Sequence, residues 1–168
     1  MFFLTRNYMD WYKISVSQPI DWTLIRANIS AVHWYHLSRN PCIKWEHIAS
    51  CCDLPWDWDG ISCHENITFE IIKENPDKPW NPTFVSCNPN ITYDVVRNNR
   101  QYRWDWSALS LNESITLQDI SNNSHEPWDG ENLSARYDLT WAFVIANEWI
   151  SWDYEYIIGY RCLDSEGC

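Results

Sequence analysis

The residues best suited to metal chemistry are histidines and cysteines in the first half of the chain. His33, His36 and His47 are close enough in sequence to suggest an imidazole site. Further candidate ligands follow at Cys51, Cys52, Cys63 and His64. Zinc sites typically place cysteines in C-x-x-C pairs, a spacing that this chain lacks. We therefore expect no metal here and interpret the histidines as incidental surface residues.

A second candidate chemistry is carbohydrate cleavage by Asp57 and Asp59, which flank Trp58. Glycosidases use two carboxylates on either side of the scissile bond. However, Asp105 and Trp106 repeat this pattern later in the chain, whereas a catalytic pair should occur once. The chain also lacks G-x-S-x-G and phosphate-binding glycine loops, and has only four glycines. We predict a protein without enzymatic activity or cofactor.

Charge and hydropathy exclude further classes of protein. The 168 residues carry 23 acidic and 12 basic side chains, a net charge of -11, which opposes nucleic-acid binding. No run approaches the roughly 18 apolar residues of a membrane span. The apolar start of the chain is too short for a signal peptide. We expect a cytoplasmic protein with no membrane partner, whose seven cysteines are mostly reduced.

The elements that position all these residues are tandem units of 24 residues. We predict a lead or cap at 1–9, one repeat domain at 10–158 and a tail at 159–168. The units are 10–32, 33–56, 57–80, 81–104, 105–128 and 129–152, with a partial unit at 153–158. We number the first residue of each unit as phase 0.

The tryptophans establish this register. Phase 23 is tryptophan in five successive units: Trp56, Trp80, Trp104, Trp128 and Trp152. Phases 1 and 12 hold most of the others, including Trp58 and Trp106 at phase 1. Phase 5 is serine from Ser15 to Ser134, and phases 4, 10 and 15 are aliphatic. Such agreement across units indicates one structural repeat.

Capping residues favour two short helices in each unit. Phase 0 is usually Asp or Asn, and Pro82 follows Asn81, as at a helix start. Threonines at phase 11, such as Thr92, predict a second start. Asparagines at phases 7 and 18, such as Asn88 and Asn99, are expected to end the helices in the left-handed conformation.

The predicted fold is therefore an all-α solenoid of about six two-helix units. The alternative is a β-solenoid or a leucine-rich-repeat-like fold, although the LxLxxN core of leucine-rich repeats is missing. Helices of about seven residues do not persist alone in water, so stability must come from stacking the units. The phase-23 tryptophans are expected to form a core ladder.

The unit consensus D-W-x-x-[IL]-S-x-N-P-x-I-T-[WFY]-[DE]-[IV]-[IV]-x-x-N-P-x-x-P-W is seen most fully at 57–104. It resembles the tryptophan-rich tandem-repeat proteins of unknown function from mimivirus-like giant DNA viruses of amoebae. The resemblance covers about residues 10–158. It implies a viral protein in host cytoplasm or in the virion, and no catalytic residues. The terminal units depart from the pattern, since 10–32 lacks the P-W end and Ile158 stands where serine is expected.

The second helix of each unit offers a candidate partner-binding face at phases 13, 16 and 17. Its residues are Glu46, Glu70, Lys73, Glu74, Asp94, Arg97 and Asn98. An acidic rim favours a basic protein partner. The leading hypothesis is a protein-protein interaction scaffold, and the alternative is a structural or virion component that self-associates. A ligand-binding module would instead need Trp58 or Trp106 at the surface.

Overall fold

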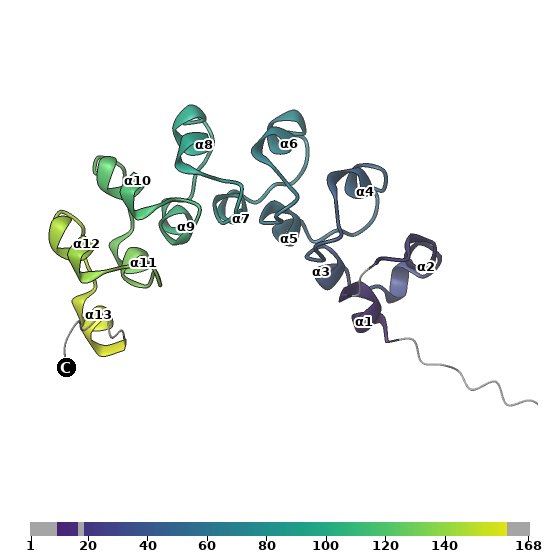
Figure 1. Ribbon diagram of the computed structural model, residues 1–168. Coiled ribbons are helices and arrows are strands. Elements are labelled where there is room, and N and C mark those ends of the chain that lie inside the picture. The colour runs from purple at the N-terminus through teal and green to yellow at the C-terminus, as the bar shows by residue number, and fades with distance from the viewer. Residues whose placement is uncertain (1–9, 17–18, 161–168) are drawn as a thin grey trace, which may run out of the picture.

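The chain is an arch of short helices in two rows (Figure 1). The computed structural model describes residues 10–16 and 19–160. Within these ranges the chain is all helical and contains no strand, which confirms the predicted α-solenoid and excludes a β-solenoid or leucine-rich-repeat-like fold. The lead at 1–9 and most of the tail at 159–168 lie outside the described residues.

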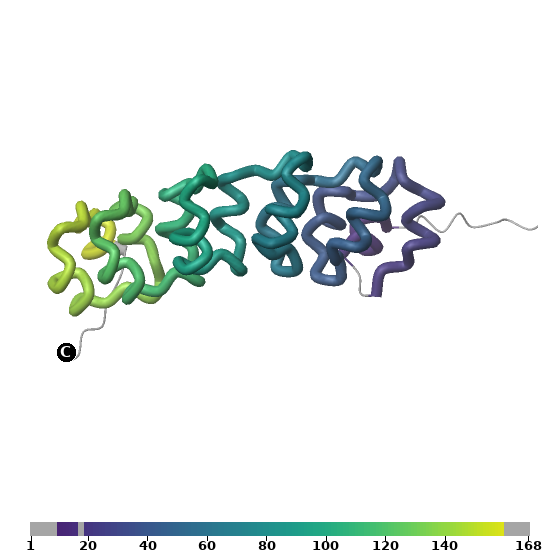
Figure 2. The backbone as a smooth tube through the Cα atoms, turned by 90° about the horizontal axis from the view of Figure 1, so that it is seen from above, coloured from purple at the N-terminus to yellow at the C-terminus, as the bar shows by residue number. Residues whose placement is uncertain are grey.

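Odd-numbered helices form the inner, concave row, and even-numbered helices form the outer row (Figure 1). The inner row is α1 (Trp11–Val16), α3 (Trp34–Leu37), α5 (Trp58–Ser62), α7 (Pro82–Ser86), α9 (Trp106–Leu111), α11 (Gly130–Ser134) and α13 (Tyr154–Tyr160). The outer row is α2 (Trp22–Ala27), α4 (Trp45–Ala49), α6 (Phe69–Glu74), α8 (Tyr93–Asn98), α10 (Leu117–Asn122) and α12 (Trp141–Ala146). A short 3-10 helix, η1 (Ile29–Ala31), follows α2. Seen from above, the units follow one another in single file (Figure 2).

The helices begin where capping residues predict. The Thr92 hydroxyl accepts from the Val95 N–H at 3.4 Å at the start of α8, and the Asp105 carboxylate accepts from the Ala108 N–H at 3.1 Å at the start of α9. These acceptors satisfy amides that have no partner within the helix.

The predicted left-handed helix ends are wrong. Asn99, which ends α8, has φ -134°, and Asn112, which ends α9, has φ -70°. Asn99 instead donates its side-chain amide to the Val95 carbonyl at 2.8 Å, four residues back. The same bond recurs at Asn75, Asn123 and Asn147. The asparagine therefore ends the helix by bonding a carbonyl within it, with no need for a positive φ.

Aliphatic side chains at phases 4, 10 and 15 form the core. In the unit 57–80 these are Ile61, Ile67 and Ile72, which are 0%, 1% and 3% exposed. The first two come from α5 and the following turn, and the third comes from α6. Each unit thus contributes a small cluster, and stacking joins the clusters into one continuous core.

Buried serines at phase 5 connect consecutive units. The Ser110 hydroxyl donates to the Trp106 carbonyl at 2.7 Å and accepts from the Asp129 N–H of the next unit at 2.9 Å. The bond to the next unit recurs at five other boundaries, from Ser15 to Ser134. These serines are fully buried, so each satisfies backbone groups that water cannot reach.

Phase 7 provides a second connection. Asn88 donates its side-chain amide to the carbonyls of Ser62, His64 and Ile67 in the preceding unit, each at 3.0 Å. Arg136 occupies this phase later and donates to the Asn112 carbonyl at 3.1 Å. Buried polar side chains of different types therefore perform the same function between units.

Candidate interaction surfaces

The five phase-23 tryptophans, here called the tryptophan ladder, are each anchored within their own unit. Their indole N–H groups donate to the backbone carbonyl five residues earlier, as Trp104 does to Asn99 at 3.0 Å. The other four bonds run from Trp56, Trp80, Trp128 and Trp152 at 2.7–3.1 Å. Trp56 and Trp152 are buried, whereas the three central rings are half-buried. The central ladder tryptophans therefore remain partly accessible to solvent.

Trp58 and Trp106, which an exposed ligand platform would require, are half-buried. Each packs edge-on against the ladder tryptophan of its own unit, Trp58 on Trp80 and Trp106 on Trp128, with ring centroids 5.1 Å apart. Their rings support the ladder and offer no flat exposed platform.

The predicted partner-binding face lies on the outer row of helices. Glu46 is on α4, Lys73 is on α6 and Arg97 is on α8. All seven residues of this face are exposed: Glu46, Glu70, Lys73, Glu74, Asp94, Arg97 and Asn98. One ion pair lies within it, between Arg97 Nε and Asp94 Oδ1 at 3.2 Å.

The sequence-based metal candidates do not converge. The rings of His33 and His36 lie 6.1 Å apart, while His47 accepts from the Lys44 N–H at 3.0 Å and packs on Trp22. Among the described residues, no group of three or more His, Cys, Asp or Glu side chains could hold a metal ion. Burial raises the pKa of the Cys63 and Cys87 thiols, which disfavours their reactive thiolate forms.

The two carboxylates around Trp58 also have structural partners. Asp57 forms an ion pair with Arg39 of the preceding unit. Asp59 accepts from the Asn81 side-chain amide at 2.7 Å. Both therefore connect neighbouring units.

Sequence reasoning missed two grooves beside the tryptophan ladder, because each is built by two successive units. The first, the Lys73 groove, has a volume of about 460 Å³. It is lined by Ile72, Lys73, Pro76, Lys78, Trp80, Pro82, Gln101, Tyr102 and Arg103. The second, the Arg100 groove, lies one unit later and has a volume of about 280 Å³. It is lined by Val96, Arg100, Tyr102, Arg103, Trp104, Trp106, Glu126 and Pro127.

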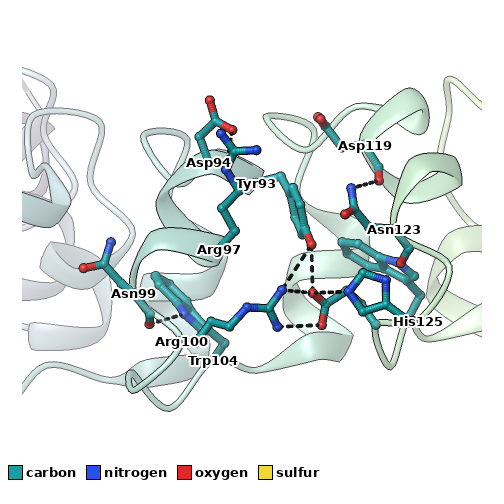
Figure 3. A network of polar contacts seen from close by, with 11 residues as sticks. Tyr93, Asp94, Arg97, Asn99, Arg100, Trp104, Asp119, Asn123 and His125 are labelled. Atoms are coloured by element: carbon teal, nitrogen blue, oxygen red, sulfur yellow. Dashed lines mark hydrogen bonds and ion pairs between the residues drawn. The ribbon is translucent and has the colours of Figure 1, made fainter.

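A polar network lies in the Arg100 groove (Figure 3). Arg100 forms a two-pronged ion pair with Glu126, in which Nη1 lies 3.2 Å from Oε2 and Nη2 contacts Oε1. The Tyr93 hydroxyl donates to Glu126 Oε1 at 2.7 Å, and His125 Nε2 lies 3.4 Å from the same oxygen. Phases 19 and 21, which hold Arg100 and Glu126, show no constant residue type that could have revealed this pair.

This network shifts the proton affinities of its members. Burial opposes the charge on Glu126, but the hydrogen bonds from Arg100 and Tyr93 outweigh it and hold the pKa of Glu126 below its ordinary value. Burial and the hydrogen bond to Glu126 raise the pKa of Tyr93 to about 12. The groove thus holds an ionised carboxylate against an arginine and a neutral tyrosine.

Two comparable grooves border the inner-row helices. One is lined by residues including Pro41, Gly60 and His64, and the other by residues including Pro89, Ala108 and Leu111. Their volumes are about 440 and 290 Å³. Inter-unit grooves therefore occur on both sides of the repeat frame.

Among the described helices, none is long and apolar enough to cross a membrane. The sequence matches no protein-family model, no curated protein and no solved structure.

Proposed function

We propose that this chain is a non-enzymatic repeat protein that acts as a protein-protein interaction scaffold, in the cytoplasm of cells infected by a giant virus. The observation that carries the proposal is the contrast between buried and exposed phases. Phase 5 stays serine in successive units, as at Ser86 and Ser110, and these side chains join the units. Exposed phase 16 changes from Lys73 to Ile145. A constant frame with variable exposed residues supports specific recognition.

The acidic residues of the outer row favour a basic partner for that face. The test is affinity capture with the purified chain from infected amoebal lysate, followed by mass spectrometry. The matched bait carries Glu46→Gln, Glu70→Gln and Asp94→Asn, which remove three exposed charges. We expect basic proteins to be enriched by the natural chain and reduced at least several-fold with the altered bait. Equal recovery with both baits would exclude this face as the binding surface.

The alternative function is a structural or virion component that self-associates. It is favoured by large apolar side chains exposed in the last units: Tyr137, Ile145, Trp149 and Ile158, which are 70%, 67%, 43% and 70% exposed. Exposed apolar surface of this kind marks many association sites. Sedimentation velocity over a hundredfold concentration range separates the two functions. A scaffold stays monomeric, whereas a structural subunit forms larger species that Ile145→Ser and Ile158→Ser should dissociate.

A further inference from the structure

We infer that the Lys73 groove binds an extended acidic segment of a partner protein, through its carboxylates and an adjoining apolar side chain. This inference rests on the proposed scaffold function and names a partner chemistry for a surface that adjoins the acidic outer face and shares Lys73 with it. The two surfaces would hold partners of opposite charge.

The charge of the groove is the first observation. Lys73, Lys78 and Arg103 line it, with no acidic residue in the lining. These are three of the 12 basic residues in a chain with 23 acidic ones. Lys78 is paired with exposed Asp77 at 2.8 Å, while no ion-pair partner is present for Lys73 or Arg103 within the described part of the chain. The groove is therefore a local cationic site.

The walls provide an apolar surface beside these charges. Trp80 is half-buried and held by its indole bond to the Asn75 carbonyl at 2.7 Å. Tyr102 is half-buried and packs edge-on against Phe69, with ring centroids 5.3 Å apart. Rings fixed in this way can receive an apolar side chain with little ordering cost.

The Arg100 groove, one unit later, shows how a carboxylate fits such a site. Trp104 there is equivalent to Trp80, and Glu126 is equivalent to Tyr102. Glu126 is 7% exposed and is held by Arg100 and Tyr93. The second groove thus carries its own carboxylate, whereas in the Lys73 groove the corresponding position is a tyrosine and the cations remain available to a partner's carboxylates.

The shape of the groove favours a peptide over the other anions. Both grooves share Tyr102 and Arg103, so the surface continues from one unit to the next, as an extended chain requires. Nucleic acid would need a longer basic surface along its backbone, whereas three basic side chains line this groove. A small phosphate compound would occupy only part of this open surface.

The test uses nuclear magnetic resonance of the full chain with the acetylated peptide Glu-Phe-Glu-Pro-Glu-Glu. We expect the peptide to shift the indole N–H signal of Trp80, with binding that weakens as salt screens the charges. The Lys73→Gln/Arg103→Gln variant should bind roughly tenfold more weakly, since it loses two exposed ion pairs. Both side chains are exposed, so the fold is retained.

The matched control is Arg26→Gln/Lys44→Gln, which removes two exposed cations outside the groove and should leave the affinity unchanged. A peptide with glutamine in place of each glutamate should not bind.

The inference is overturned if the Trp80 signal does not move at millimolar peptide, or if the glutamine peptide or inorganic phosphate shifts it equally well. The inference is also overturned if the Trp80 signal broadens as the protein concentration rises without peptide, and if the Lys73→Gln/Arg103→Gln variant does not show this broadening. A second copy of the chain would then occupy the groove. Failure of the peptide while lysate capture still succeeds would reject this site and leave the scaffold function intact.

Discussion

Ser110 and Asp129 are joined across a unit boundary by a hydrogen bond from the Asp129 N–H to the Ser110 hydroxyl at 2.9 Å. The Ser110 side chain is fully buried. The equivalent position is serine in every unit from Ser15 to Ser134, and each of these serines is fully buried. One small hydroxyl therefore satisfies the free amide at the start of each following helix.

Ser110→Ala should destabilise the protein by about 1–3 kcal/mol, because it leaves the Asp129 N–H without its partner. Urea unfolding followed by circular dichroism measures this loss. Ser124→Ala is the matched control, since Ser124 is exposed in a turn, and it should change the free energy of unfolding by less than about 0.5 kcal/mol. Equal stability of the two variants would show that the serine connections contribute little.

Trp104→Ala should cost about 3 kcal/mol, the usual loss for truncating a large aromatic core residue. The ring contacts Phe69 and Tyr102, with centroids 5.1 and 4.7 Å away, and its N–H bonds the Asn99 carbonyl. Trp149→Ala removes a tryptophan that is 43% exposed and should cost much less. A loss below about 1 kcal/mol for Trp104→Ala would reject the ladder as a main source of stability.

Gly130→Ala should be strongly destabilising, by about 3 kcal/mol. An added Cβ would lie 2.1 Å from the carbonyl oxygen of Ser151 in the same unit, which is backbone and cannot move aside without shifting the segment that leads into α13. Gly159→Ala tests helix propensity alone, because nothing lies within 4 Å of its Cβ, and should be neutral or stabilising by about 0.5–1 kcal/mol. Thermal melts of both variants measure the destabilisation that the close approach at Gly130 causes.

Acid should weaken the contacts between units. Hydrogen bonds from the hydroxyls of Thr83 and Ser107, at 2.6 and 2.5 Å, hold the pKa of Asp105 and Asp129 below the ordinary 3.8. A lowered folded-state pKa adds stability that is present above the unfolded-state value and lost as pH falls through the folded-state value. The urea concentration at the unfolding midpoint should therefore fall as the pH is lowered below about 4. It should fall less steeply in the Thr83→Val/Ser107→Ala variant. Parallel curves for the two proteins would contradict this assignment.

Alkali should act through Tyr93, whose pKa is raised to about 12. A raised folded-state pKa means that its contribution is complete below the ordinary value of 10.0 and is lost as pH rises toward 12. Absorbance titration at about 295 nm should show one tyrosine ionising later than the exposed ones, and Tyr93→Phe should remove that step. Glu126→Gln should shift the step to lower pH, because the neutral amide no longer disfavours the tyrosinate.

Much of the fold was predictable from the sequence because the same capping and apolar positions recur in several units. Thr92 and its equivalents indicated where outer-row helices begin, and the buried Ile61, Ile67 and Ile72 lie at the aliphatic phases. The left-handed ends were predicted wrongly. Asparagine also bonds carbonyls within its own helix, as Asn99 does, or across units, as Asn88 does, and the residue type alone does not distinguish these uses.

The sequence by itself determined the helical unit, its period and its core, because these depend on local capping and on periodic apolar residues. Only the tertiary structure revealed the pairing of Arg100 with Glu126 and the meeting of Lys73 with Arg103 in one groove. These positions differ in residue type from unit to unit, so no repeat pattern marks them. Their proximity depends on how one unit stacks on the next, and the sum of many inter-unit contacts sets that geometry.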